Sequence, residues 1–423
     1  MSQPVESPTL TSDRSLWRDR NFLTMWSGQA LSQFGAQITE LALPVLAVLL
    51  LQATEFDVGL LGAAGTAAFL LVGLPAGAWI DRLRKRHVMV AADLVRAVAL
   101  AALPLLWWAG VLEIWHMVLV ALVMGVATVF FDVSYQSVVP SLVPANHIAE
   151  ANGKLESTAQ LAGIAGPAAG GWLIGVITAP FAVLVTAATY LLSAGALLRT
   201  RDTERVAERH EHDPLVSSIR EGLRWVFHNV HLRRIVGTTA VSNFFSTITF
   251  TLLPIFLLRT LGLSPAQMGV IFAVGAVGGF IGALVTPRIL RRLGEARTIP
   301  VSALVFSLIA LLLPVAVIIP SIAFPLLLVQ SFLATFSVLL YNITQVTFRQ
   351  RITPPRLLGR MNASIRFCVW GVMPIAALLA GGLGTWLGVP TTMWIAAVGA
   401  VLSALFVVTG PFWRMRELPT PGD

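Results

Sequence analysis

Residues 77–86 read Gly77-Ala-Trp-Ile-Asp81-Arg82-Leu-Arg84-Lys85-Arg86, a charged turn between two long apolar stretches. Hydrophobic residues make up 56% of the 423-residue chain and charged residues only 12%. Soluble domains carry about a quarter charged residues, so this chain has too few to cover a water-facing surface of its size. The sequence therefore predicts an integral membrane protein in which polar turns such as 77–86 separate the spans.

Apolar stretches of about 20 residues, the length that crosses a bilayer as an α-helix, recur along the whole chain. We predict an all-α membrane protein with twelve spans, at residues 21–51, 58–80, 87–109, 114–139, 154–177, 180–198, 233–259, 266–287, 298–319, 321–347, 363–387 and 390–411. The short alternating segments typical of a membrane β-barrel are absent from the sequence. Residues 1–19 are polar and precede a span too long for a signal-peptide core, so we expect the first helix to be retained.

The basic residues predict the orientation, because Lys and Arg near the ends of spans stay in the cytoplasm. Of the 29 basic residues, all but Arg96, which lies within a span, and Arg259 fall in the tails and loops of one side. We therefore expect a multi-pass protein of the inner (plasma) membrane with both termini cytoplasmic. The formal net charge of +8 follows from this topology and from attraction to anionic lipids. A nucleic-acid partner is not needed to explain it.

The chain repeats itself with an offset of 210 residues. Pro44, Pro104, Pro144 and Pro180 align with Pro254, Pro314, Pro354 and Pro390, and several glycines align as well, including Gly59 with Gly269 and Gly171 with Gly381. Six spans return the chain to the side on which it began, so the two halves share one topology. This predicts two pseudosymmetric six-helix bundles related by an axis along the membrane normal.

The repeat divides the chain into five segments. We predict a cytoplasmic tail (1–19), an N-terminal bundle (20–198), a cytoplasmic linker (199–232), a C-terminal bundle (233–411) and a second cytoplasmic tail (412–423). Within and beyond the linker, residues 214–234 have the pattern of an amphipathic helix with Leu215, Ile219, Leu223, Val226 and Phe227 on one side. We expect this helix to lie along the cytoplasmic face of the membrane.

The turn at 77–86 resembles the cytoplasmic signature of the major facilitator superfamily, Gly-x-x-x-Asp-Arg-x-Gly-Arg-Arg, with Arg84 where the general pattern has glycine. The departure resembles the drug:proton antiporter-3 branch, which includes siderophore exporters and macrolide or multidrug efflux pumps. The resemblance, together with motifs elsewhere in the chain, implies the major facilitator fold and transport by alternating access. It also implies that Asp81, with Gly77, Arg82 and Arg86, closes the cytoplasmic side. A simple basic membrane anchor is the alternative reading of this turn.

The fifth span contains Gly163-x-x-Gly166-Pro167-Ala-Ala-Gly170-Gly171. Proline removes a backbone hydrogen bond and small residues permit close helix packing, so this segment is suited to bending against a partner helix. It is similar to the Gly-Pro-x-x-Gly-Gly element of antiporters in the same superfamily, which implies export and lets the halves rock near Pro167. Ordinary small-residue packing is the alternative.

Acidic residues within spans are candidates for function, because charges in the bilayer are costly. Asp93 and Arg96 are spaced as an i, i+3 pair near the cytoplasmic end of the third span, and Asp132 lies at a similar depth in the fourth. We interpret Asp93, Arg96 and Asp132 as parts of a cytoplasmic gate that pairs with the basic turn, rather than as ligands of the cargo.

Glu40 lies past the middle of the first span with no basic residue at the same depth, so we predict that it carries the coupled proton. It shares one helix face with four polar side chains, and polar residues on the seventh and tenth spans match them. A polar stripe within the bilayer must face protein or water. We predict a substrate cavity lined by Gln29, Ser32, Gln33, Gln37, Asn243, Ser246, Thr247, Tyr341, Asn342 and Gln345. Hydrogen bonding between helices is the alternative.

These features together predict a secondary active transporter that exports amphipathic small organic molecules, such as drugs, siderophores or other secondary metabolites, by proton antiport. The alternative is an uptake symporter or facilitator of the same fold. We expect no enzyme activity, because the sequence places no nucleophile and base at the same depth in the membrane. We also expect no cofactor or metal, because the sequence has one cysteine, scattered histidines and no phosphate-binding loop. We expect a monomer whose partners are the cargo, protons and the lipid bilayer.

Overall fold

The computed structural model describes residue 16 and residues 19–72, 79–80, 83–143, 147–200 and 215–415. The first half contains α1 (Arg20–Val45), α2 (Glu55–Leu71), α4 (Lys85–Trp108), α5 (Ile114–Leu142), α6 (Ile148–Ile177) and α7 (Ala179–Arg199). Helix α8 (Leu215–His228) follows the linker. The second half contains α9 (Val230–Ile255), α10 (Pro265–Leu293), α11 (Glu295–Ala310), α12 (Leu312–Ile318), α13 (Ala323–Ile352), α14 (Pro355–Trp370), α15 (Met373–Leu387) and α16 (Val389–Val408).

Most of these helices can cross a membrane. Within the described residues, eleven helices are long and apolar enough to do so. At the twelfth predicted span, 58–80, the structure has α2, which ends at Leu71 before the undescribed residues 73–78. Two other predicted spans are interrupted: α11 is followed by the short α12, and α14 and α15 are separated by a turn at Gly371 and Val372. The fold is therefore all-α as predicted, with an approximate count of twelve spans.

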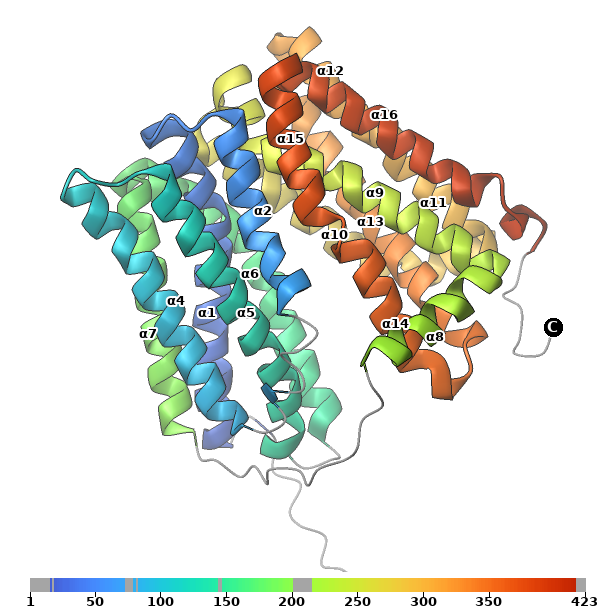
Figure 1. The fold of residues 1–423 in the computed structure, drawn as a ribbon, viewed down its shortest axis with the longest axis horizontal. Helices are drawn as coiled ribbons and strands as arrows, with labels where there is room; N and C mark the ends of the chain where they lie inside the picture. Colours follow the sequence, from blue (N-terminus) through green and yellow to red (C-terminus); the bar gives the residue numbers. More distant parts are fainter. Residues whose placement is uncertain are drawn as a thin grey trace, which may run out of the picture.

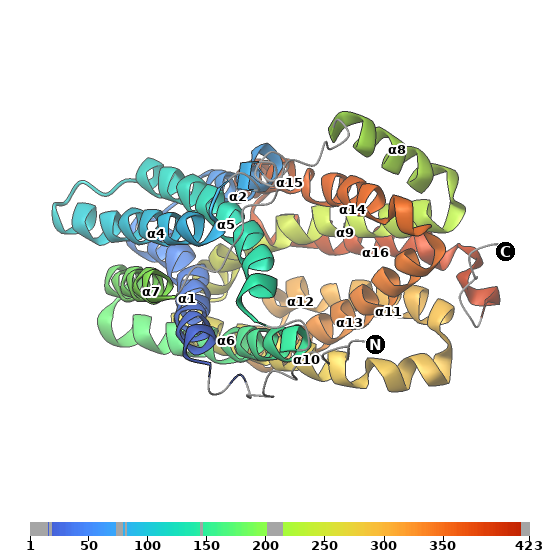
Figure 2. The same cartoon turned by 90° about the horizontal axis from the view of Figure 1, so that it is seen from below.

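The two halves form two helix bundles that lie side by side (Figures 1 and 2). In the first half, α1 and α4 pack on α7, and α5 packs on α2 and α4; in the second, α13 packs on α10 and α11, and α9 on α15 and α16. The two most extensive contacts between the halves are those of α6 with α10 and of α2 with α15. These contacts lie at opposite edges of the boundary in Figure 2.

The 210-residue repeat extends to the backbone. Asp19 and Asn229 cap α1 and α9 in the same way, each accepting two backbone N–H bonds through its side-chain oxygen. Past Pro44 and Pro254, both helices continue as π-helical turns, Leu46–Leu50 and Phe256–Thr260. Gln52 and Thr178 have φ of 52° and 71°, and their counterparts Gly262 and Gly388 have 66° and 81°. Equivalent turns therefore adopt the same left-handed conformation even where the first half lacks glycine.

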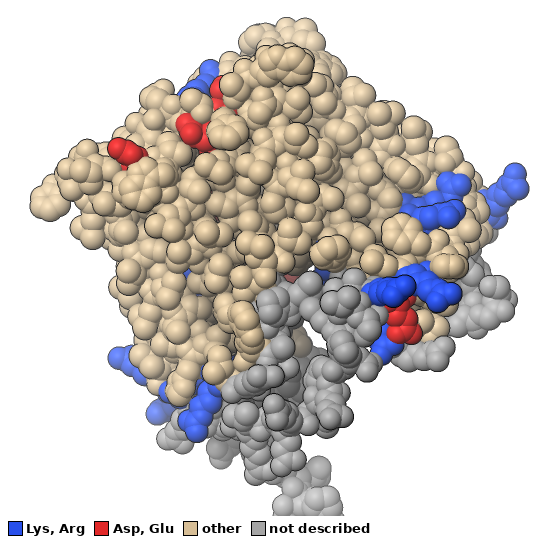
Figure 3. All heavy atoms as spheres, in the orientation of Figure 1, with Lys and Arg blue, Asp and Glu red and all other residues tan. Residues whose placement is uncertain are grey.

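The charged ends of the helices distinguish two sides of the molecule. We call the side that holds Arg84, Arg86, Arg291 and Arg351 the basic side. In Figure 1 the two bundles diverge from the top, the first toward the lower left and the second toward the right. On the face drawn in Figure 3, charged side chains gather near the upper edge and in the lower and right-hand parts, and the surface between is almost entirely uncharged. Such an uncharged belt is what a bilayer requires of the surface that it contacts.

Helix α8 is shorter than predicted and belongs to the second half. It ends at His228, because Asn229 caps the next helix there. Val226 is buried in a cluster with Leu232, Met361 and Ile365, so one side of α8 packs on α9 and α14. Glu221 forms an ion pair with Arg360 at the same contact. Phe227, by contrast, is 51% exposed.

Candidate transport site

The polar stripe of α1 meets the glycine-rich part of α6 at Gln37. Gln29 and Ser32 are buried, Gln33 and Gln37 are half-buried, and Glu40 is exposed. Glycine permits the close approach: a Cβ placed on Gly166 would lie 2.5 Å from the Cβ of Gln37. The structure therefore brings the predicted proton carrier and the predicted antiporter motif to one helix pair, which the sequence alone had not joined.

The same stretch of α6 also contacts the other half of the molecule. A Cβ on Gly171 would lie 2.7 Å from the carbonyl oxygen of Pro265 and 3.3 Å from the Cα of Gly269. A Cβ on Gly269 would lie 2.3 Å from the carbonyl oxygen of Pro167. Gly170 packs against Ile38, whereas Gly163 has nothing within 4 Å of its Cβ position. One and a half turns of α6 thus connect the α1 stripe to the boundary between the halves.

The polar residues predicted in the second half surround a cavity of about 250 Å³. Asn243, Ser246, Tyr341 and Asn342 line it, as do Thr238, Thr239, Ser242, Phe250, Phe306 and Thr335. A neighbouring cavity of about 120 Å³ shares Ser246, Phe250, Phe306 and Thr335 with it and extends to Leu253, Gln330 and Met393. Hydroxyl groups, amide groups and aromatic rings therefore line the same space.

All lining residues of these two cavities belong to the second half, so the α1 stripe does not share them. Two predicted residues lie behind the wall: Thr247 is buried and donates to the carbonyl oxygen of Asn243 at 2.8 Å, and Gln345 is buried beside the cavity wall on α13. The Tyr341 hydroxyl lies 3.0 Å from the Thr239 hydroxyl and connects α13 to α9. Phe306 and Thr335 were not predicted, because each lies in an apolar span with nothing in its sequence context to mark it.

The predicted gate residues Asp93 and Arg96 form an ion pair in the interior of the first half. Both are buried, with exposed fractions of 0% and 4%. The guanidinium carbon of Arg96 lies 4.3 Å from the centroid of the Phe131 ring and 4.5 Å from that of Tyr190, so the charge is also held by two aromatic faces. Asp132 follows Phe131, is exposed, and is close enough to Arg96 to interact electrostatically with it.

Arg86 of the basic turn bonds within its own half rather than with the gate residues. Arg86 Nη1 donates to the carbonyl oxygen of Thr200 at 2.6 Å, so it caps the end of α7 within its own half. Asp93 pairs with Arg96 and Arg86 bonds Thr200, so Arg86 does not make the expected pairing between the basic turn and the gate. Gly77, Asp81 and Arg82 lie outside the described residues.

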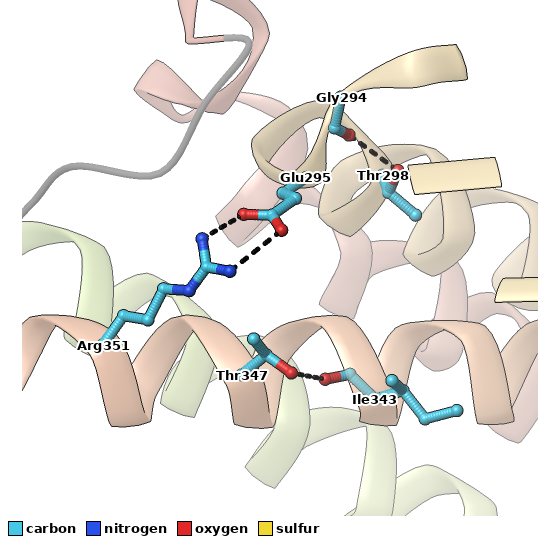
Figure 4. A network of polar contacts seen from close by, with 6 residues as sticks. All are labelled: Gly294, Glu295, Thr298, Ile343, Thr347 and Arg351. Carbon is cyan, nitrogen blue, oxygen red and sulfur yellow. Dashed lines mark hydrogen bonds and ion pairs between the residues drawn. The ribbon is translucent and has the colours of Figure 1, made fainter. Parts of the chain in front are cut away.

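The second half shows why Arg84 can stand where the signature has glycine. Arg84 precedes α4 with φ of −70°, which any residue adopts, whereas its counterpart Gly294 precedes α11 with φ of 87°. The next residue, Glu295, forms a two-pronged ion pair with Arg351 at 2.5 and 3.2 Å (Figure 4). Thr298 and Thr347 donate to the carbonyl oxygens of Gly294 and Ile343 beside this pair.

Comparison with known proteins agrees with this fold. The model of the Major Facilitator Superfamily matches residues 25–376, and the chain belongs to that family. The chain is 26% identical over 401 residues to the multidrug efflux pump Tap of Mycolicibacterium fortuitum, covering 91% of this chain and 93% of the relative. It is 23% identical over 406 residues to macrolide efflux protein A of Streptococcus pyogenes, with 94% and 97% covered.

A solved structure is similar as well. The crystal structure of a bacterial homologue of the human lysosomal transporter Spinster, in an inward-facing and unoccupied conformation, superposes with a TM-score of 0.70. It shares 15% sequence identity and covers 96% of this chain and 98% of its own. At this identity the likeness concerns the fold alone. The chain is thus a multi-pass membrane protein with the transporter fold.

Proposed function

We propose that this protein exports amphipathic small organic molecules by exchanging them for protons. The observation that carries the proposal is the position of Glu40, an acid on the polar stripe of α1. Helix α1 packs against α6, the helix in contact with the other half. A carboxyl group placed there can bind a proton within the span, and its charge state acts on the helix pair that must move. The relatives named multidrug and macrolide efflux pumps support export.

The cargo class follows from the cavity of the second half. Its hydroxyl and amide groups can orient a polar part of the cargo, and Phe250 and Phe306 can cover an apolar part. The described lining residues of both cavities include no acidic or basic side chain. We therefore propose cargo with hydrogen-bonding groups and a large apolar surface, bound in part by the second half and moved past the α1 stripe.

The transport cycle we propose is a rocking of residues 20–198 against residues 233–411, connected by the linker 199–232. The basic side is cytoplasmic, both termini lie in the cytoplasm, and the protein acts as a monomer in the inner (plasma) membrane. The basic turns support this orientation. The two halves meet through glycines near the opposite side, and we propose that in this conformation cargo is collected from the cytoplasm.

The experiment that tests this proposal measures drug efflux from cells. A bacterium lacking its own pumps expresses the chain and is loaded with ethidium or a fluorescent macrolide, and the loss of fluorescence is followed after energisation. We expect faster efflux than in the empty-vector strain, abolished when nigericin collapses the proton gradient. Faster accumulation instead would overturn export in favour of uptake, and efflux that survives nigericin would overturn proton coupling.

A further inference from the structure

Arg259 bridges the two halves on the side opposite the basic side. It lies in the π-helical turn Phe256–Thr260 at the end of α9. Its Nη1 donates to the carbonyl oxygen of Ala53 and its Nη2 to the carbonyl oxygen of Val48, each at 2.6 Å. Both acceptors belong to the first half, more than 200 residues earlier in the chain. One guanidinium therefore joins the two bundles by two short bonds.

The two acceptors are groups that need a partner. The last carbonyls of a helix receive no bond from within the helix, and they form the negative end of its dipole. At the end of α1, the side chain of Gln52 donates to the carbonyl oxygen of Leu49 at 2.8 Å. Arg259 supplies the donor for Val48 in the preceding position and also reaches Ala53 beyond the turn. Bonds of this charge-assisted kind are about twice as strong as neutral ones.

The bridge has no counterpart by symmetry. The residue equivalent to Arg259 in the first half is Leu49, which is 41% exposed. The glycine contacts, in contrast, occur in two symmetric copies, Gly59 with Gly381 and Gly171 with Gly269. Close packing of glycines allows the halves to slide or separate without breaking a polar bond, whereas the Arg259 bridge must break as a unit.

We propose that Arg259 is the latch that keeps the protein closed on the side opposite the basic side, and that both of its bonds break each time the protein opens there. This inference rests on the proposed alternating access. The latch holds the ends of α1 and α9, the two helices that carry Glu40 and the cavity residues Asn243 and Ser246. Its strength therefore sets how often cargo bound at these helices is released to the far side.

The two bonds of the latch require the side chain of arginine. Its planar fork offers two donors in fixed geometry, whereas the ammonium group of lysine is a compact point charge. Arg259→Lys keeps the charge and the long stem but cannot hold both carbonyls in the same way. Arg259→Gln removes the charge. We expect the closed-to-open ratio to fall about tenfold in Arg259→Gln, as expected for the loss of a charge-assisted bond, and by a smaller factor in Arg259→Lys.

The test measures the distance between the two halves on the latch side by double electron–electron resonance. In a Cys368→Ser background, spin labels are placed at Val111→Cys, in the turn before α5, and Ile322→Cys, in the turn before α13; both residues are exposed. We expect a single distance in the parent and an added longer distance in Arg259→Gln. Arg291→Ala, an exposed arginine on the basic side, is the matched control and should leave the distances unchanged.

Distances in Arg259→Gln that equal those of the parent would overturn the latch. If that variant does not yield monodisperse protein, Arg259→Lys is measured instead, because it retains the charge and the stem. Its distances should then shift in the same direction. Unchanged distances in Arg259→Lys would overturn the proposal. The readout needs no cargo. A shift without any drug efflux would therefore keep the latch and reject export, whereas unchanged distances with proton-dependent efflux would reject the latch alone.

Discussion

Gly171 and Gly269 face each other across the boundary between the two halves, so that a Cβ on either would lie 3.3 Å from the Cα of the other. Gly59 and Gly381 repeat this relationship at the other edge of the boundary, with distances of 2.8 and 3.1 Å. The four glycines are equivalent in pairs through the 210-residue repeat. The two glycine contacts between the halves are therefore one arrangement used twice, and each allows backbone to approach backbone.

Gly269→Ala should disturb this contact. Its new methyl group would lie 2.3 Å from the carbonyl oxygen of Pro167, which is backbone and cannot turn aside. We expect a cost of about 1–3 kcal/mol to the described conformation and slower drug efflux. The measurements are the melting temperature in detergent and the efflux rate. Gly163→Ala is the control within the antiporter motif: its site is open, and alanine favours helix, so neither quantity should fall.

Gly166→Ala addresses the link between α6 and the α1 stripe. A methyl group there would collide with the Cβ of Gln37, and α1 must shift to accommodate it. We expect a changed KM for cargo, or a changed proton dependence of efflux, with the protein still folded. Wild-type values of both would contradict the proposed link between these helices.

The two ion pairs should differ greatly in their effect on stability. Arg96→Met leaves Asp93 buried without its partner, and we expect a loss of about 3–5 kcal/mol. Arg351→Ala removes a pair in which Arg351 is 52% exposed, and we expect a loss of at most about 1 kcal/mol. Thermal unfolding in detergent compares the two. In the double variant Asp93→Asn/Arg96→Met, part of the lost stability should return, and a further loss would contradict the explanation by an unpaired charge.

Phe306→Ala tests the cavity of the second half. The ring lines both cavities, so its loss should weaken the binding of apolar cargo and raise KM by about tenfold, while maximal efflux changes less. Phe280→Ala is the control, because Phe280 is 44% exposed and lines neither cavity. Equal effects of the two substitutions would remove the cavity from the cargo path.

Local signals in the sequence predicted much of this fold. Span length and hydrophobicity are properties of short stretches, so the helices could be predicted from them directly. The aligned prolines predicted the two halves, which have the same helix caps and π-helical turns. Contacts between distant segments could not be predicted in this way. Nothing near Arg259 indicates that its acceptors are Val48 and Ala53, and nothing near Arg86 indicates Thr200, because these partners depend on how the helices pack.

The candidate site was predicted to a lesser degree for the same reason. Helical periodicity placed Gln29, Gln33, Gln37 and Glu40 on one face, but it could not say that Gly166 would lie beneath Gln37. It grouped Asn243 and Tyr341 with them in one cavity, whereas the structure has these two residues around a cavity lined by the second half. A single apolar residue such as Phe306 carries no mark of its role.

Proton flux in proteoliposomes tests whether Glu40 couples cargo export to proton movement. Liposomes containing the purified protein and a trapped pH-sensitive dye receive an exported drug, and the internal pH is followed for the parent, for Glu40→Gln and for Glu156→Gln, an exposed acid on α6. We predict drug-driven proton movement in the parent and in Glu156→Gln. In Glu40→Gln, proton movement should be lost while exchange of labelled for unlabelled drug persists. Drug-driven proton movement at the parent rate in Glu40→Gln would contradict proton coupling through Glu40.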